Sequence, residues 1–349
     1  MNSVLSLSES KNDLRELIDG KNILITGGTG SFGHKLVEIL IADFSPKKIV
    51  IYSRDEFKQV NMKKRFPQTN VRFLIGDVRD YERTKTALTG IDFVFHAAAL
   101  KVVPLIEYNP YEAVKTNVIG TQNVVNASIE KNVKRVIALS TDKACRPFNT
   151  YGVSKSLLEK LVVGGNLLSD ENGTKFSVLR YGNVMGSRGS IIPFFQKQTL
   201  ENKEMTITDE RMTRFNITII QAVNFALNAL LIMHKGEIFI PKITSYNIIQ
   251  LANVIGGTDI QKKIIGIREG EKLHEMMVSE EESLFTYDCG SFYFITPFSN
   301  DLFPTKKYIA HYKRFVPIRC NLDFSYVSNK NEYITDADLK NLIDNLDIV

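Results

Sequence analysis

Residues 22–33 read NILITGGTGSFG, an apolar run that passes directly into a glycine-rich turn. The run 22–26 is rich in β-branched and apolar residues, which predicts a strand buried on both faces of a sheet. The glycines of the turn (Gly27, Gly28, Gly30 and Gly33) let a phosphate group approach the free amides at the start of the following helix. The stretch therefore predicts a dinucleotide site between a strand and a helix.

The same alternation of strand and helix continues through the first half of the chain. Further strands are predicted at 48–52, 71–75, 92–96, 135–140 and 176–180, and helices at 34–43 and 117–131. Near-continuous apolar strands separated by helices are typical of a parallel sheet covered on both faces. The sequence thus predicts an α/β fold with a Rossmann-type, doubly wound parallel sheet.

The pattern loosens after about residue 185, where most of the expected elements are short. Residues 216–234 predict a helix and 236–241 one more strand, and this pair is expected to return to the sheet. We expect an N-terminal extension at 1–20, with a helix around 11–18, and a nucleotide-binding domain at 21–184. Residues 185–349 are expected to form mainly a smaller C-terminal substrate-binding lobe.

Composition argues against several classes of protein. The 349 residues carry a formal net charge of only +5, which suits an anionic small molecule better than nucleic acid. No apolar run reaches the roughly 18 residues of a membrane span, and the N-terminus lacks the apolar core of a secretory signal. Because no membrane span is indicated, we expect no membrane partner. The cysteines are scattered and form no CxxC pair, so we expect no metal and a cytoplasmic location.

The end of the second predicted strand bears on the choice of cofactor. It reads Ser53-Arg54-Asp55-Glu56, and serine with arginine suits the 2′-phosphate of NADP, whereas an acidic residue at the strand tip would favour NAD. We therefore predict NADP; the alternative is that Arg54 is an ordinary solvated arginine. Asp77 and Val78, which follow the third strand, are expected to border the adenine.

A second cluster of polar residues follows the fifth predicted strand. Thr141, Asp142 and Lys143 close that strand, and Tyr151 and Lys155 follow at a spacing that places them on one face of a helix. A nearby ammonium is expected to lower the pKa of the tyrosine from about 10 toward neutrality, which would let it act as a base on a sugar hydroxyl.

Together these motifs resemble the extended short-chain dehydrogenase/reductases. Within them the chain is most similar to the inverting UDP-N-acetylglucosamine 4,6-dehydratases that open the pseudaminic acid pathway. The resemblance covers about residues 21–275 and rests on GGTGSFG (27–33), YSRDE (52–56), IGDVRD (75–80), HAAALKVVP (96–104), KTNVIGTQNVV (115–125), LSTDK (139–143), YGVSK (151–155), RYGNVMGSRGSIIPFF (180–195), ITDERMTRF (207–215) and GIREGEKLHE (266–275).

The resemblance implies a role for each residue of these motifs. The cofactor would contact Gly27, Thr29, Gly30, Ser31, Phe32, Gly33, Ser53, Arg54, Asp55, Glu56, Lys58, Asp77, Val78, Ala97 and Lys101, with Tyr151 and Lys155 at the nicotinamide ribose. The UDP-sugar would contact Lys101, Lys143, Asn183, Gly189, Ser190, Ile191, Arg211, Arg214, Arg268 and Glu271. Arg268 is the candidate clamp for the diphosphate, and Asn117 would support Lys155 through a proton network.

The pair Asp142-Lys143 also implies a reaction, because related hexose dehydratases carry Asp-Glu at this step and 4-epimerases carry no acid–base pair there. Tyr151 would deprotonate the C4 hydroxyl while hydride leaves C4. A neutral Lys143, its pKa lowered by burial, would then remove the C5 proton, and Asp142 would protonate the departing C6 hydroxyl. Return of the hydride to C6 and protonation of C5 on the opposite face would invert C5.

Several alternatives stay open at this stage. Asp142-Lys143 could be a structural ion pair, and the chain could be a UDP-sugar 4-epimerase or a non-catalytic NADP-binding regulatory protein. Cys145 and Arg146 depart from the family pattern, and we interpret Cys145 as a packed residue rather than a reactive thiol. Relatives of this architecture are oligomeric, so the resemblance implies a homo-oligomer.

Overall fold

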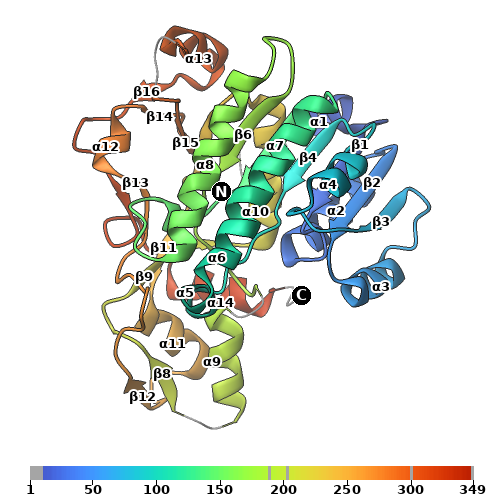
Figure 1. Cartoon of the computed structure of the whole chain (residues 1–349). Helices are drawn as coiled ribbons and strands as arrows, with labels where there is room; N and C mark the ends of the chain where they lie inside the picture. The colour runs from blue at the N-terminus through green and yellow to red at the C-terminus, as the bar shows by residue number, and fades with distance from the viewer. Residues whose placement is uncertain (1–10, 188–189, 202–203, 299–301, 347–349) are drawn as a thin grey trace.

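The computed structural model describes residues 11–187, 190–201, 204–298 and 302–346. Its main sheet is built on the predicted parallel strands (Figure 1). The spatial order is β16 (Ile318–Arg319), β14 (Thr286–Asp288), β15 (Phe292–Ile295), β10 (Ile238–Pro241), β6 (Lys175–Leu179), β5 (Arg135–Leu139), β4 (Phe93–His96), β1 (Asn22–Thr26), β2 (Lys48–Ser53) and β3 (Val71–Ile75). The α/β, Rossmann-type prediction is confirmed.

Helices cover both faces of this sheet. One face carries α4 (Tyr81–Ala87), α7 (Gly120–Glu130) and α8 (Thr150–Leu168), and α8 packs against β6. The other carries α1 (Lys11–Ile18), α2 (Ser31–Asp43) and α10 (Ile219–Ile232), which contact one another in a row. Strands between two helical layers are inaccessible to water, which explains their continuous apolar sequences.

The predicted boundaries hold closely where the pattern is local. β1, β3 and α1 span the predicted residues, and the other strands differ by one or two positions. Residues 216–217 are an exception, because they end strand β9 (Thr213–Ile217) instead of beginning a helix. Thr218 then caps α10, with Gln221 completing the capping box, so the helix begins at Ile219. In addition, residues 114–119 form a π-helical turn, η2, ahead of α7.

The C-terminal half contributes more to the main sheet than expected. β10 pairs in parallel with β6, and β15, β14 and β16 continue the sheet in antiparallel order. The expectation that 185–349 forms mainly a separate lobe is therefore wrong for these strands. Their sequences are only two to four residues long and are separated by irregular segments, so no periodicity indicates them.

A smaller lobe with its own apolar core lies beside the carboxyl ends of the parallel strands, at the bottom of Figure 1. Its core includes Phe195, Met205 and Leu251. The lobe is formed by α9 (Ile191–Leu200), β8 (Met205–Ile207), α11 (Ile248–Gly256), β12 (Lys262–Ile264) and α14 (Asp336–Asp344). Between lobe and sheet run β7 (Asn183–Val184), β9, β11 (Ser245–Asn247), β13 (Met276–Val278) and β17 (Tyr326–Val327).

The remaining helices are short. They are α3 (Glu56–Arg65), α5 (Val103–Tyr108), α6 (Pro110–Ala113), η3 (Asp142–Ala144), α12 (Glu280–Ser283), α13 (Thr305–His311) and η4 (Lys313–Phe315). Across the described ranges, we find no helix with the length and apolarity needed to cross a membrane.

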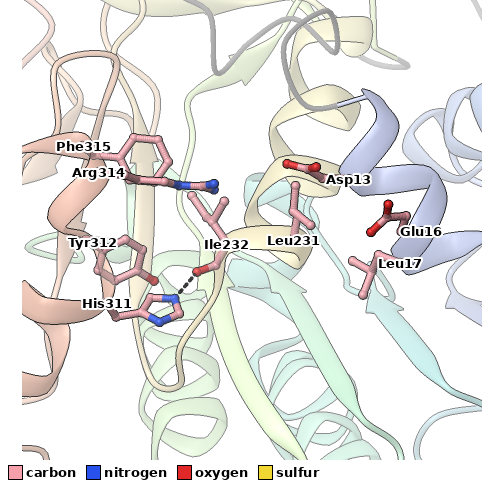
Figure 2. Close-up of a pocket in the computed structure, with 9 residues that line it drawn as sticks. All are labelled: Asp13, Glu16, Leu17, Leu231, Ile232, His311, Tyr312, Arg314 and Phe315. Carbon is pink, nitrogen blue, oxygen red and sulfur yellow. Dashed lines mark hydrogen bonds between the residues drawn. The ribbon is translucent and has the colours of Figure 1, made fainter.

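A surface pocket lies where α1, the end of α10 and α13 meet (Figure 2). His311 closes one side by a 2.7 Å hydrogen bond between its Nε2 and the carbonyl oxygen of Ile232. Because the end of α10 leads into the start of β10, this pocket lies at the amino edge of the parallel sheet. The predicted site lies at the opposite, carboxyl edge, so the pocket is separate from it.

Candidate active site

The predicted cofactor residues follow the carboxyl ends of β1, β2, β3 and β4. These ends meet at one edge of the sheet, and the spatial order β3-β2-β1-β4-β5-β6 reverses direction between β1 and β4. A crevice at such a reversal is where open α/β sheets bind nucleotides. Gly27 lies in it with a φ of +62°, and a Cβ there would come within 2.8 Å of the backbone of Ala98. Only glycine fits that approach.

The start of α2 is suited to a phosphate. Its N-cap residue is Gly30, so no side chain accepts a hydrogen bond from the first amides of the helix. Unsatisfied amides at a helix N-terminus, together with the helix dipole, attract an anion. Thr29 and Phe32 are buried beside this turn, and Phe32 packs against Phe95 of β4. The turn thus combines a rigid backbone with open donors.

At the tip of β2, some of the predicted cofactor residues are engaged within the fold, and Arg54 is exposed to a ligand. Ser53 is buried and its hydroxyl accepts a hydrogen bond from Gln59, whereas Arg54 is half-exposed, 3.6 Å from a carboxylate oxygen of Asp77. The carboxylate of Asp55 caps α3 through the Lys58 amide, which lies 2.9 Å away. Arg54 is therefore the group of this tip that is open to a ligand, while Asp55 is engaged by its own helix.

Asp77 is held as an anion beside that arginine. Burial alone would raise the pKa of its carboxyl, but hydrogen bonds from Arg79 and the charge of Arg54 lower it. Val78 is buried against Gly120 of α7, and Ala97 and Lys101 lie in the segment that follows β4. Partial burial lowers the pKa of the Lys101 ammonium. Glu56 is the first residue of α3, next to the Asp55 cap.

The acid–base pair predicted after β5 lies at the centre of a buried ionic cluster. Asp142 is fully buried, and its Oδ1 lies 3.1 Å from Nζ of Lys143. The same ammonium lies 2.9 Å from Oε1 of Glu275 and donates to Oδ1 of Asn183 at 3.2 Å. Arg214 approaches Glu275 from β9, with Nε 3.8 Å from Oε1. Four segments of the chain therefore meet in this cluster.

The charges in this cluster differ from expectation at Lys143. Burial alone would lower its pKa, but Asp142 and Glu275 raise it above the usual value. The expectation of a neutral Lys143 is wrong for this arrangement, because two carboxylates stabilise the ammonium. Burial and the charge of Glu275 raise the pKa of Asp142, whereas Lys143 and Arg214 lower that of Glu275 against the effect of burial. Of the two carboxyls, Asp142 is the one whose pKa is raised.

Tyr151 also departs from expectation. It lies in the first turn of α8, and burial raises its pKa to about 12, with Lys143 and a hydrogen bond to Thr141 opposing the rise. The predicted lowering of the tyrosine pKa by Lys155 is therefore wrong. Lys155 donates a hydrogen bond to the carbonyl oxygen of Leu139, and burial lowers its own pKa to about 8. Lys155 is thus the group with a pKa close to neutrality.

Thr141 and Asn117 hold the surrounding backbone. The hydroxyl of Thr141 donates to Asp142 Oδ1 at 3.0 Å. Asn117 is fully buried in η2, where its side chain exchanges two hydrogen bonds with the backbone of Leu100 and donates a third to Ser154. These bonds tie η2 to the β4–α5 segment and to α8, one residue from Lys155. A π-helical turn of this kind often marks a functional site.

The predicted arginines are not equivalent. Arg214 is largely buried and belongs to the Lys143 cluster, whereas Arg211 is exposed and forms two hydrogen bonds with Asp209. Arg268 and Glu271 are joined in a turn by a backbone hydrogen bond from the Glu271 amide to the Arg268 carbonyl oxygen. Asn149, the N-cap residue of α8, donates to the carbonyl oxygen of Gly270 in this turn at 2.7 Å. The turn is thereby attached to the helix that carries Tyr151. The structure brings Arg214 and the Arg268 turn to the site, whereas the guanidinium of Arg211 is engaged by Asp209.

A second helix start lies near the cluster. Asn183 opens β7, and Ser190 is the N-cap residue of α9, which begins at Ile191. The hydroxyl of Ser190 is buried and has no hydrogen-bond partner among the described residues. A hydroxyl and open amides at this position could bind a second phosphate. Gly189 lies outside the described residues.

Sequence reasoning missed three residues of the site. Glu275 ends the GIREGEKLHE motif, but no local pattern indicates that it reaches Lys143. Lys272 donates to the carbonyl oxygens of Cys145 and Arg146, which attaches the same segment to the loop between η3 and α8. Asn149 holds the Arg268 turn, a role that its place in the sequence does not indicate. Each contact joins residues far apart in sequence, so only the folded chain reveals them.

Cys145 behaves as a packed residue. It is buried, and burial together with the charge of Glu282 raises the pKa of its thiol well above the usual value. A protonated, enclosed thiol is a poor nucleophile. Arg146 is paired with Glu280 and Glu281 at the surface. Within the described ranges, no group of three or more histidine, cysteine, aspartate or glutamate side chains is placed to hold a metal ion.

Comparisons with known proteins agree with this geometry. Residues 23–297 match the model of a family described as polysaccharide biosynthesis protein. The chain belongs to this family. The match includes nearly all of the parallel strands, the cofactor turn and the Lys143 cluster.

Two curated relatives narrow the comparison. An inverting UDP-N-acetylglucosamine 4,6-dehydratase of Campylobacter jejuni is 52% identical over 80% of this chain and 84% of its own length. A UDP-glucose 4-epimerase of Rickettsia bellii is 41% identical over 94% of this chain and 97% of its own. The first confirms the resemblance inferred from the motifs.

A solved structure extends the agreement to the whole fold. The X-ray structure of Pen from Bacillus thuringiensis superposes with a TM-score of 0.85 and is 36% identical. The superposition covers 95% of this chain and 99% of the Bacillus thuringiensis chain. The C-terminal strands and the small lobe therefore belong to the shared architecture.

Proposed function

We propose that this protein removes one molecule of water from UDP-N-acetylglucosamine, which leaves a ketone at C4 and a methyl group at C6, and that it inverts C5. The product is a UDP-2-acetamido-2,6-dideoxy-4-keto-hexose. The single observation that carries the proposal is the Lys143 cluster, where an acidic carboxyl and an ammonium lie together in a buried site next to Tyr151. The Campylobacter jejuni relative, named for this reaction, supports the choice of substrate.

The cofactor of the proposal is NADP. The residues fit such a group, since a Cβ at Gly27 would close the phosphate approach and the amides at the start of α2 carry no side-chain cap. Gly27, Gly30 and Ser31 would hold the diphosphate, and Arg54 the 2′-phosphate by a charge-assisted, forked pair. When bound, NADP supplies a hydride acceptor and donor.

Four protein groups then handle protons. Tyr151 takes up the proton of the C4 hydroxyl, and Lys155, which is mostly an ammonium near neutral pH because its pKa is about 8, stabilises the resulting phenolate. Asp142, whose pKa is raised by burial and by the charge of Glu275, gives a proton to the departing C6 hydroxyl. Lys143 removes the C5 proton once it has itself lost one. Arg214, Arg268 and Ser190 bind the UDP-sugar, with Lys101, Asn183, Ile191, Glu271 and Gly189 as further contacts.

A second candidate is a UDP-sugar 4-epimerase. The Rickettsia bellii relative favours it, because the match extends over almost the whole of both chains. An epimerase exchanges hydride at C4 alone, so it has no use for the buried Asp142–Lys143–Glu275 cluster beside that carbon. The cluster is our reason for preferring the dehydratase.

The remaining parts of the proposal concern the protein's setting. The free thiols of Cys145, Cys289 and Cys320 suit a reducing cytoplasm. Exposed apolar side chains on the contacting helices α5, α6 and α8 suit a homo-oligomer interface: they are Leu105, Tyr108, Tyr111, Val153 and Leu157. The product fits surface glycan or pseudaminic acid synthesis.

One experiment tests reaction and substrate together. The protein is incubated with UDP-N-acetylglucosamine in deuterated water, and the product is identified by NMR. We expect a 4-keto-6-deoxy sugar with inverted C5 and deuterium at that carbon. A C4 epimer that retains its C6 oxygen would establish the epimerase instead. A Lys143→Ala variant should bind NADP normally and lose dehydration by about 10²–10⁴-fold.

A further inference from the structure

Glu275 is the least explained group of the site. It stands just before β13, where its backbone amide donates to the hydroxyl of Ser328 at 2.9 Å and its carbonyl accepts from the Ser328 amide. This double attachment fixes the direction of a side chain that is only 2% exposed. The carboxylate reaches Lys143 at 2.9 Å, closer than Asp142 does.

The second oxygen of the carboxylate is also informative. Oε2 of Glu275 is buried and has no hydrogen-bond partner in the described part of the chain, and the same holds for Oδ2 of Asp142. A carboxylate kept only for structure normally has both oxygens satisfied when buried. Here each of the two carboxylates keeps one oxygen open on either side of a single lysine.

Lys143 therefore lies between two carboxyl groups and needs to lose a proton before it can act as a base. The charged and titratable groups that face Lys143 or Glu275 come from four helices and strands and from the segment that precedes β13. They are Asp142 (η3), Tyr151 (α8), Arg214 (β9), Tyr246 (β11) and Lys272. Asp142 is needed as the acid for the leaving hydroxyl. Glu275 is therefore the group that remains to accept the proton of Lys143.

We propose that Glu275 is a positioning residue that accepts the proton of Lys143 when substrate is bound and so makes Lys143 the base for C5. This inference rests on the proposed function and names the device that the same site uses. Glu275 acts through Lys143 and does not itself contact the sugar.

The protons balance over one elimination. The Lys143 ammonium gives a proton to the Glu275 carboxylate, which leaves an amine and a carboxylic acid. The amine takes the C5 proton, the C5–H electrons form the C5–C6 double bond, and the C6–O bond breaks as Asp142 protonates the leaving hydroxyl. The proton on Glu275 then passes back through Lys143 to Asp142, which restores all three groups and releases one water.

Substrate binding supplies the physical reason for the first transfer. An ion pair is favoured while water and neighbouring dipoles solvate it, and a closed, dry site penalises both charges at once. Lys143 retains 20% exposure of its side chain, and a sugar packed over it removes that contact with water. The neutral lysine–carboxylic acid pair then becomes accessible without exchange with solvent.

The test compares the wild-type protein with Glu275→Gln, which keeps the shape and a hydrogen-bond acceptor but cannot take the proton. C5 deuterium exchange is followed by NMR between about pH 7 and about pH 9, and reduction of bound NADP is followed by absorbance. We expect cofactor reduction within about threefold of wild type, and C5 exchange at least about 100-fold slower at neutral pH. The variant's exchange should rise about tenfold per pH unit, because solvent must now remove the proton.

The wild type and two further variants complete the design. For wild type, the ratio of C5 exchange to cofactor reduction should change little over this range, because titration of Lys155 affects both rates. Glu275→Asp should keep that flat ratio at a lower value, and the exposed Glu281→Gln should match wild type. A Glu275→Gln ratio near wild type, or a wild-type ratio that itself rises tenfold per pH unit, would overturn the inference; the wild-type profile decides even when the Gln variant does not fold. Absence of any keto sugar with wild type would instead sink the proposed function, and this inference with it.

Discussion

The Cα atom of Gly33 faces the carbonyl oxygen of Gly28 so closely that a Cβ on Gly33 would overlap that oxygen. The contact is made by backbone atoms on both sides, so a rotamer change cannot relieve it. It holds the first turn of α2 against the glycine-rich turn, and it explains why a glycine is required inside a helix at this position.

The first prediction follows from that contact. Gly33→Ala should destabilise the fold by about 2 kcal/mol or more, since the turn must open to admit the methyl group. It should also weaken NADP binding. Thermal and urea unfolding measure the first effect, and fluorescence titration with NADP the second.

Gly164 supplies the matched control. It lies in the interior of α8, and no described atom outside its own stretch of helix comes within 4 Å of the place that a methyl group would occupy. Gly164→Ala should therefore stabilise the protein by about 0.5–1 kcal/mol, because alanine is the better helix former. If the two variants unfold alike, the close contact at Gly33 is not what selects glycine.

The second prediction concerns the choice between cofactors. Arg54→Ser removes the half-exposed guanidinium at the tip of β2, so NADP affinity should fall about 10- to 100-fold while NAD affinity stays nearly the same. Calorimetric titration with both nucleotides measures the ratio. Arg65→Ser, at the far end of α3, should leave both affinities unchanged. Equal losses for the two nucleotides would contradict recognition of the 2′-phosphate.

The third prediction concerns Asn117. Replacement by alanine leaves the amide and carbonyl of Leu100 without their partners in a buried segment, which should cost about 2–4 kcal/mol of unfolding free energy. Urea denaturation provides the measurement. Asn126→Ala, on the exposed side of α7, should change stability by less than about 0.5 kcal/mol. A small effect at Asn117 would show that the η2 turn is held by other contacts.

The fourth prediction is a loss of stability in acid. Arg180 is fully buried and lies 2.6 Å from Glu159 and 2.8 Å from Glu282. Burial alone would raise the pKa of Glu282, but Arg180 lowers it. A carboxyl whose folded-state pKa is lowered contributes stability above its unfolded value of about 4.3, and loses it as pH falls through the folded value.

Unfolding free energy should therefore decline below about pH 5, as measured by urea titrations at a series of pH values. Glu282→Gln should be less stable near neutral pH and show a weaker decline, because the titrating group is gone. Glu281→Gln removes an exposed carboxylate and should leave the curve nearly unchanged. A Glu282 variant with the wild-type slope would locate the acid sensitivity elsewhere.

Local sequence patterns predict much of the fold. The bounds of β1 and β3 match their predictions to the residue, because each strand is a short apolar run ended by glycine or polar residues. The strands 286–288 and 292–295 escape prediction, since short antiparallel strands without a helix between them leave no period to detect. Residues 216–217 were misassigned because a capping box displaces the helix start by three positions.

For the site, sequence alone determined which chemical groups stand at the ends of the parallel strands. The glycine turn, Arg54 and Asp142-Lys143 all follow from residue type and spacing, because a parallel sheet brings its carboxyl ends to one edge. Tyr151 follows from its place at the start of the helix after the fifth strand. The tertiary structure alone decided their charges. Glu275 reaches Lys143 from a distant segment and turns an expected amine into an ammonium, because the pKa of a buried group depends on burial and on the charges packed around it, which spacing along the chain does not encode.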